Sequence, residues 1–249
     1  MIPVTRSALY LDGISVSFDG FKALNDLSIE LAPGELRAVI GPNGAGKSTM
    51  MDVITGKTRP DEGTALFLGQ HDLTSLDETE IANLGIGRKF QKPSVIETLT
   101  VWENLELALA GNRSPWRSIM QILHPQDRRQ MNDVASRVGL VDQLNSLGGS
   151  LSHGQKQWLE IGMLLLQEPD VLLVDEPAAG MTDSETMKTA ELLKSLSGEH
   201  TVMVVEHDME FVEALGCKVS VLHEGHVLAE GSLSHVSANS DVIDVYLGR

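Results

Sequence analysis

A glycine-rich stretch at residues 41–49, GPNGAGKST, constrains this chain more than any other part of its sequence. It fits the pattern G-x-x-x-x-G-K-[ST], in which glycines let successive backbone N–H groups point into one hollow. The apolar run at 38–40 is typical of a buried strand, and the apolar residues in 50–54 favour a helix that ends at Gly56. A chance match in a chain of this length is roughly a one-in-a-hundred event. We therefore expect the stretch to bind a nucleoside triphosphate rather than to be a plain glycine-rich turn.

Two side chains near the end of this stretch suit a nucleotide that carries a metal ion. Lys47 supplies a full positive charge for the β- and γ-phosphates, and Ser48 supplies a hydroxyl for Mg²⁺. The N-terminus of the following helix adds a partial positive charge. The predicted nucleotide-binding residues of the loop are Gly41, Pro42, Asn43, Gly44, Ala45, Gly46, Lys47, Ser48 and Thr49.

The composition narrows the class of partner. The chain has 249 residues, enough for one large or two small domains, and its 19 basic and 35 acidic residues give a net charge of −16. It has no basic run, which argues against nonspecific nucleic-acid binding, and we interpret its acidity as a solubility feature. The single Cys217 excludes an internal disulfide. Since neither a signal-peptide pattern nor an apolar run near the ~20 residues of a membrane span occurs, any membrane role is expected to be peripheral, on the cytoplasmic side.

The first two of three zones differ in their predicted secondary structure. The first zone reaches about residue 90 and is strand-rich, with a predicted strand pair at 9–18 and 23–31 and a short strand at 64–68. The second zone, at about 93–167, is predicted to be helical. Within it, residues 112–129 contain two prolines and mixed charge, and we interpret them as a connector or short insertion.

The third zone returns to α/β and ends its first strand in two acidic residues. Apolar runs at 171–174 and 201–205 have the length of strands covered on both faces, and residues 187–196 suit a helix between them. Alone, Asp175 and Glu176 would be a solvated strand end. Beside a phosphate loop, Asp175 can hold Mg²⁺ through water, and Glu176 can polarise the water that attacks the γ-phosphate.

Other polar residues leave two interpretations open. Ser152 and Gln155 have the spacing of a capping box, so they predict either a well-capped helix or a second anion site at its N-terminus. The amide of Gln91 could contact Mg²⁺ or the attacking water, although a lone glutamine is usually polar surface. His207 follows the strand at 201–205, where a lone histidine is more often a satisfied polar residue.

Together these residues resemble the nucleotide-binding subunit of ATP-binding-cassette (ABC) transporters, over nearly the whole chain and in the family's order. After the phosphate loop, Gln91 matches the glutamine loop, and LSHGQ at 151–155 matches the family's LSGGQ signature apart from its third position. Residues 171–176 match the Mg²⁺ strand with its glutamate. Residues 179–183 lie where the family has a dimer-contact loop, and His207 matches the switch histidine.

The resemblance implies a role for each of these residues. Phe18 lies where an aromatic ring commonly stacks on adenine, and Phe21 is the weaker candidate. The implied catalytic residues are Glu176, His207, Gln91 and Lys47. The implied Mg²⁺ contacts are Ser48, Gln91 and Asp175. The implied contacts to ATP on a second subunit are Ser152, Gly154 and Gln155, and His153 alters only the fine geometry there.

The resemblance also implies a fold, namely α/β, a P-loop NTPase of the ABC nucleotide-binding type with an antiparallel β subdomain and an inserted helical subdomain. Residues 1–249 would form one ATP-binding domain. Its RecA-like and β core would occupy about 1–91 and 168–249, and the helical signature subdomain about 92–167. Two such subunits would sandwich two ATP molecules, each between one chain's phosphate loop and the other chain's signature.

The implied function is that of an ATP-hydrolysing subunit powering an ABC importer, with ATP and Mg²⁺ as cofactors. Its partners would be a second ABC ATPase subunit, the same or related, two transmembrane permease subunits and, indirectly, an external solute-binding protein, with no nucleic acid. The tail at 242–249 and the run at 178–181 resemble the branched-chain amino acid and urea importers, and residues 151–160 most resemble the urea type. We expect urea, amides or branched-chain amino acids as cargo, and the cytoplasmic face of the membrane as the location.

Three alternatives remain. A soluble ABC ATPase of DNA repair or translation usually has a basic surface or two cassettes, whereas this chain has one cassette and a charge of −16. A nucleotide-binding regulator without turnover does not need Lys47, Glu176 and His207 together. A GTPase is disfavoured because the chain lacks an Asn-Lys-x-Asp motif for guanine.

Overall fold

Two β-sheets and a group of helices make up the part of the chain that a computed structural model describes, residues 7–89, 94–110 and 124–247. One sheet is antiparallel, with the strand order β2-β1-β4-β5. The other has the order β10-β9-β3-β8-β7-β6 and is parallel except for β10. The strands are β1 (Leu9–Phe18), β2 (Phe21–Leu31), β3 (Leu36–Ile40), β4 (Glu62–Phe67), β5 (His71–Asp72), β6 (Ile86–Lys89), β7 (Val171–Asp175), β8 (Thr201–Val205), β9 (Lys218–His223) and β10 (His226–Gly231).

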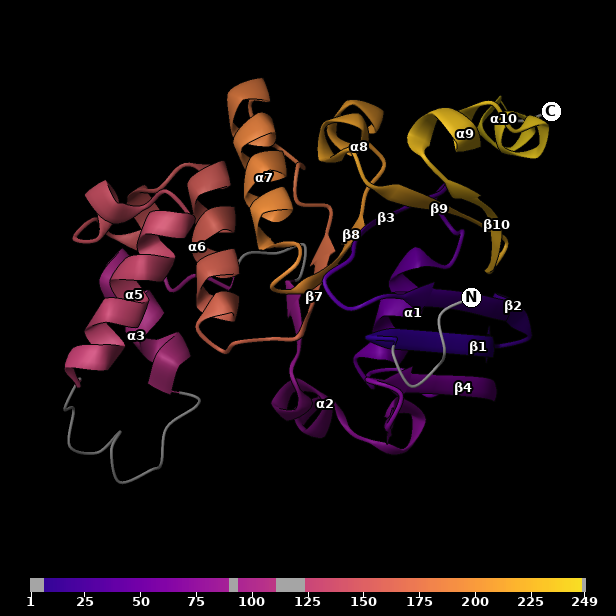
Figure 1. The fold of residues 1–249 in the computed structure, drawn as a ribbon, viewed down its shortest axis with the longest axis horizontal. Helices are drawn as coiled ribbons and strands as arrows, with labels where there is room; N and C mark the ends of the chain where they lie inside the picture. The colour runs from indigo at the N-terminus through magenta and orange to yellow at the C-terminus, as the bar shows by residue number, and fades with distance from the viewer. Residues whose placement is uncertain (1–6, 90–93, 111–123, 248–249) are drawn as a thin grey trace.

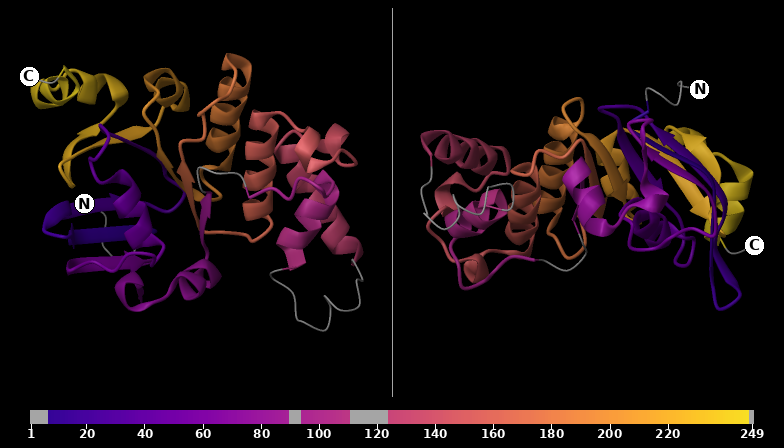
Figure 2. Two further views of the ribbon diagram at one scale, coloured as in Figure 1. Left: turned by 180° about the vertical axis from the view of Figure 1, so that it is seen from behind. Right: turned by 90° about the horizontal axis from the view of Figure 1, so that it is seen from below.

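The two ends of the molecule differ in secondary structure. Figure 1 shows α3, α5 and α6 gathered at one end and β1, β2 and β4 at the other, and the view from behind in Figure 2 agrees. Helix α7 contacts both α6 and α8. The helices are α1 (Lys47–Ile54), α2 (Glu78–Leu84), α3 (Val101–Ala110), α5 (Pro125–Arg137), α6 (His153–Leu165), α7 (Asp183–Leu196), α8 (Met209–Leu215), α9 (Leu233–Ser237) and α10 (Ser240–Leu247).

The central strands β3, β7 and β8 are buried on both faces, which explains why most of their positions are apolar. On β7, Leu172 and Val174 belong to the core shared with the helices α3, α5, α6 and α7. Val171 and Leu173 belong instead to the core shared with α1 and the antiparallel sheet. Each such side chain contributes about 1.5–3 kcal/mol by burial. The strand therefore joins the two cores and holds its C-terminal end at a fixed place between them.

Most of the predicted elements are confirmed with small shifts at their ends. The strand pair at the start of the chain forms, with β2 beginning at Phe21, and the strands predicted at 171–174 and 201–205 are β7 and β8. Helix α7 begins at Asp183, four residues before the predicted start. Thr182 and Glu185 form a capping box there, with each side chain bonded to the other residue's backbone N–H.

Several short elements are not predicted by the sequence analysis. They are β5, β6, α2, α8, α9 and α10. Strand β6 has no strand-like sequence pattern, because the charged residues Arg88 and Lys89 are not typical of a buried strand. The connector expected over residues 112–129 is wrong from Pro125 onward, where α5 begins with proline in its first turn. Residues 111–123 lie outside the described part of the chain.

Candidate active site

The phosphate loop joins β3 to α1 and is closely packed on two sides. A side chain at Gly46 would lie 2.6 Å from the carbonyl oxygen of Ala23, and the φ angle of Gly46 is +100°. A side chain at Gly41 would collide with the carbonyl oxygen of Leu222. Only glycine avoids these collisions and tolerates the positive φ angle of Gly46. The loop therefore packs closely between β2 and β9, with its backbone facing the cavity.

Lys47 is the first residue of α1 and folds over the loop. Its Nζ donates hydrogen bonds to the carbonyl oxygens of Gly41 at 2.6 Å and Pro42 at 3.0 Å. Burial lowers the pKa of Lys47, and the charges of Glu176 and Asp175 oppose this by raising it. The ammonium group is thus held between the loop and the two carboxylates.

Asp175, the last residue of β7, lies in a buried ion-pair network. Arg88 on β6 places Nη2 3.4 Å from Oδ2 of Asp175 and Nη1 2.5 Å from Oδ1 of Asp52 on α1. Burial raises the pKa of Asp175, and the neighbouring Arg88 only partly opposes this. Arg88 therefore links β6, α1 and β7, a link that the sequence did not predict.

Glu176 follows Asp175 in the chain, but its backbone conformation and the side chain beside its carboxylate differ from those of Asp175. Its φ angle of +44° is uncommon for a residue other than glycine, and its N–H donates to the carbonyl oxygen of Val205 at 2.9 Å. Its Oε1 lies 3.6 Å from Nδ1 of His207, which follows β8. His207 is 64% exposed, so its ring stands at the edge of the site.

Glu206 is a positioning residue that the sequence analysis missed. Its carboxylate is buried and accepts hydrogen bonds from the N–H groups of Ala178 at 2.9 Å, His207 at 2.8 Å and Asp208 at 3.2 Å. It therefore ties the loop after β7 to the loop after β8, and so fixes Glu176 relative to His207. A glutamate directly after the apolar run at 202–205 is the signal that could have found it.

A cavity of about 310 Å³ brings most of the predicted residues together. Its lining includes the phosphate loop from Asn43 to Thr49, together with Asp175, Glu176 and Val205. Phe18 and Phe21 face each other across the turn between β1 and β2 and line the same cavity. Their exposed fractions are 49% and 65%, so their rings remain open to a planar ligand.

The signature residues lie elsewhere. Ser152, Gly154 and Gln155 stand at the start of α6 and do not line this cavity. The predicted capping box forms, because Ser152 accepts from the Gln155 N–H at 3.2 Å and the Gln155 side chain accepts from the Ser152 N–H at 3.0 Å. Gln91 lies outside the described residues.

The oxygen donors at the cavity suit a magnesium ion held jointly with a nucleotide. Within the described ranges, no group of three or more His, Cys, Asp or Glu side chains could hold a metal by itself. Ser48 and Asp175 nevertheless line one cavity and offer a hydroxyl and a carboxylate. Mg²⁺ is usually bound by one or two protein ligands, substrate phosphates and waters, so these residues fit such an ion.

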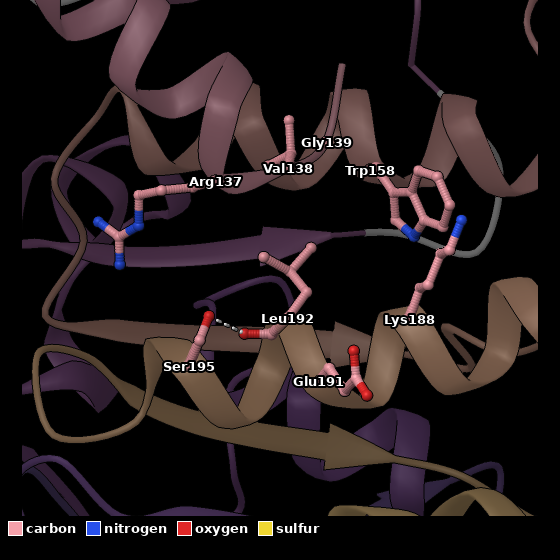
Figure 3. Close-up of a pocket in the computed structure, with 8 residues that line it drawn as sticks. All are labelled: Arg137, Val138, Gly139, Trp158, Lys188, Glu191, Leu192 and Ser195. Atoms are coloured by element: carbon pink, nitrogen blue, oxygen red, sulfur yellow. Dashed lines mark hydrogen bonds between the residues drawn. The ribbon is translucent and has the colours of Figure 1, made fainter. Parts of the chain in front are cut away.

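A second cavity, of about 380 Å³, lies between α7 and the C-terminal end of α5, with Trp158 of α6 beside it and away from the phosphate loop. Figure 3 shows Trp158 of α6 and Lys188 of α7 approaching each other at its edge. The Lys188 ammonium is 5.9 Å from the centre of the Trp158 ring, and the indole N–H donates to Thr189 at 2.8 Å. The cavity therefore marks a junction at which α6 and α7 are joined by side chains.

Comparison with protein families identifies the class to which this fold and cavity belong. Residues 24–179 match the family model described as ABC transporter. The chain belongs to the ABC transporter family and is an ATP-hydrolysing ABC ATPase. The predicted fold class and enzyme class are thereby confirmed.

Individual relatives match the chain over its whole length. It is 34% identical to the high-affinity branched-chain amino acid transport ATP-binding protein LivG of Escherichia coli K12, covering 99% of this chain and 100% of LivG. It is 32% identical to BraF, of the same description, from Pseudomonas aeruginosa, with the same coverage. The solved ADP conformation of MJ1267, an ATP-binding cassette of an ABC transporter, has a TM-score of 0.84 at 28% identity and covers 98% of this chain and 99% of its own.

Along the described ranges, no helix combines the length and the apolar character that crossing a bilayer requires.

Proposed function

We propose that this chain is the ATP-hydrolysing subunit of an importer for urea, amides or branched-chain amino acids. The observation that carries the proposal is the cavity in which the phosphate loop, Asp175 and Glu176 meet. The transport names of full-length relatives support an importer. They do not favour the alternative of a soluble ABC ATPase acting in DNA repair or translation.

In the proposed reaction, the loop and Lys47 bind the β- and γ-phosphates while an adenine ring stacks near Phe18. Glu176 polarises the attacking water, and His207, 3.6 Å from its carboxylate, keeps that carboxylate oriented toward the γ-phosphate. Lys47 exchanges its present contacts with Gly41 and Pro42 for the phosphate oxygens. The developing charge is stabilised by groups that are already in place.

Ser48 and Asp175 would hold the magnesium ion, and Gln91 is proposed as a further contact. When bound, the ion neutralises phosphate charge and orients the γ-phosphate. In the structure, Nη2 of Arg88 lies 3.4 Å from Oδ2 of Asp175 and holds this carboxylate in place.

The subunit is proposed to work in pairs, since its signature residues lie apart from its own phosphate loop. Ser152, Gly154 and Gln155 would contact the ATP held by a second ABC ATPase subunit, the same or related. A protein with a similar fold, the bacterial cassette MJ0796, has been solved as a dimer. The segment at about 92–167 would pass closure to two permease subunits, with the pair at the cytoplasmic face of the membrane and an external solute-binding protein delivering the cargo.

The urea type is proposed on the signature helix, where residues 151–160 read LSHGQKQWLE. The test is uptake into vesicles that contain the complete transporter and internal ATP, with labelled urea, acetamide and leucine compared side by side. We expect uptake of urea or acetamide above that of leucine. Uptake of leucine alone would contradict the urea type, and uptake of none would contradict the importer. Vesicles with the Glu176→Gln variant provide the background rate.

A further inference from the structure

The carboxylate of Glu185, on α7, contacts the first turn of the signature helix α6. Oε1 of Glu185 accepts a hydrogen bond of 2.6 Å from the Ser152 hydroxyl. Oε2 accepts from the N–H and the hydroxyl of Thr182, at 3.0 and 2.9 Å. Both oxygens of Glu185 are therefore engaged, one of them across the junction between the two helices.

The contact with α6 is also close in space. A side-chain atom added to Gly154 would lie 2.7 Å from both Cδ and Oε1 of Glu185. Glycine at this position thus lets the carboxylate lie against the helix backbone. The positive end of a helix dipole favours an anion there.

The Glu185 carboxyl group is ionised at neutral pH. The hydrogen bond from Ser152 and the bonds from Thr182 hold the pKa of Glu185 below its ordinary value, and His153 acts in the same direction. Ser152 and Gly154 are the residues proposed above to meet the γ-phosphate of the partner's ATP. In the present structure a carboxylate of the same chain accepts the Ser152 hydroxyl and lies against Gly154.

We propose that Glu185 is an internal latch: it occupies the anion position of the signature helix in the unpaired subunit, and the γ-phosphate of the partner's ATP displaces it when the pair closes. The proposal rests on the proposed composite ATP site. It adds a step to that site, since ATP must exchange with Glu185 rather than enter an open position.

The exchange needs only a side-chain movement. The α6–α7 junction is held one turn further along by the buried hydrogen bond of Trp158 with Thr189, at 2.8 Å (Figure 3 shows Trp158). The backbones of the two helices therefore stay together when Glu185 leaves Ser152. Thr182, at the end of the proposed dimer-contact loop, would lose its two bonds to the Glu185 carboxylate in the exchange, while its hydroxyl still accepts from the Glu185 backbone N–H.

The test replaces Glu185 by glutamine in a chain that also carries Glu176→Gln to prevent turnover. Glutamine at this position still completes a capping box, so the start of α7 is preserved while the negative charge is removed. Association with a second subunit is followed by light scattering as Mg-ATP is titrated, for the chain alone and mixed with the related ATPase of the same transporter. We expect E185Q to lower the ATP concentration for half-maximal association about tenfold, the factor worth one charge-assisted hydrogen bond.

Two further variants sharpen the result. Glu191→Gln makes the same charge change six residues further along α7 at an exposed site, so it controls for reduced repulsion between acidic subunits. Ser152→Ala removes both the latch and the phosphate contact, and should raise the ATP concentration required. Equal midpoints for E185Q, E191Q and the E176Q parent would overturn the latch and leave the composite site intact. Failure of the E176Q parent to associate at any ATP concentration would overturn the composite site, and the latch with it.

Discussion

At the scale of single residues, two adjacent acids at the end of β7 have separate partners. Asp175 pairs with Arg88, whereas Glu176 turns through a left-handed backbone to lie beside His207. A non-glycine residue in this conformation costs on the order of 1–3 kcal/mol, and such residues cluster at functional sites. The conformation supports the assignment of different tasks to the two carboxylates.

The Glu176→Gln variant tests the general-base assignment. It should bind ATP as the parent does and lose nearly all turnover, because an amide of the same size cannot take up the proton of the attacking water. ATP binding is measured by calorimetry and turnover by phosphate release. Turnover within a few-fold of the parent rate would mean that another group activates the water.

The Lys47→Ala variant tests the phosphate contact. Removal of a charge-assisted contact worth roughly 1.5–3 kcal/mol should weaken ATP binding about ten- to a hundredfold. Among the residues that the structure describes, the ammonium bonds only backbone carbonyl groups of its own loop, so these acceptors can turn to water when it is lost. An unchanged dissociation constant for ATP would remove Lys47 from the site.

The Phe18→Ala variant tests the adenine contact. Loss of one stacking ring should cost about 1 kcal/mol of ATP affinity, and the same change at Phe21 should cost less. Both rings line the cavity and are exposed, so neither change should disturb the core. Equal ATP affinity in the Phe18 variant and the parent would place the base elsewhere.

At the scale of elements, the sequence predicts what local pattern and capping decide. The phosphate loop, the apolar strands β7 and β8 and the capping box at the start of α6 all follow from residues close together in the chain. Helix α2 has the same kind of signal, since Asp77 and Glu80 form a capping box. This helix was therefore predictable from the sequence, although it was not predicted.

Contacts between distant segments could not be predicted in this way. Glu206 bonds Ala178, and Glu185 bonds Ser152, across 28 and 33 residues of sequence. Each acid reads as ordinary polar surface or as a helix cap when only its neighbours are considered. The site's composition was therefore predictable, whereas the side chains that position it were not.

A buried arginine joins the two sheets and provides a test at the scale of elements. Arg37 of β3 donates to Glu230 of β10 at 2.5 Å and to the carbonyl oxygen of Glu30 on β2 at 3.1 Å. Glu230 also accepts from Ser220 at 2.6 Å and from Lys218 at 2.9 Å. Burial raises the pKa of Glu230, but these hydrogen bonds and the charge of Arg37 outweigh it, so the pKa lies below its ordinary value of 4.5.

The Glu230→Gln variant should therefore lose stability in a pH-dependent manner. A depressed carboxyl pKa stabilises the fold above pH 4.5, and this contribution disappears as the pH falls through the folded-state value. The variant should be about 2 kcal/mol less stable than the parent at neutral pH, with the difference shrinking in acid. Urea unfolding of both chains at pH 7 and at successively lower pH measures it. A difference that stays constant with pH would show that Glu230 acts through packing alone.

At the scale of the whole molecule, the proposed pairing brings two acidic chains together. Each copy carries a net charge of −16, so association is opposed by repulsion that salt screens over about 10 Å at 0.1 M. Bound ATP must supply contacts that exceed this repulsion. Because the signature residues lie outside the cavity of their own chain, those contacts would come from the phosphate loop of one subunit and α6 of the other.

This geometry predicts that ATP turnover by the isolated subunit depends on its concentration. Well below the dissociation constant of the pair, the fraction of paired subunits is proportional to concentration, so tenfold dilution should lower the rate per subunit about tenfold. Phosphate release is measured over a dilution series at saturating Mg-ATP, for the chain alone and for an equimolar mixture with the related ATPase. In the complete transporter, where permeases hold the two subunits together, the rate per subunit should not change on dilution. A constant rate per subunit from a chain that light scattering shows to be monomeric would contradict the composite site.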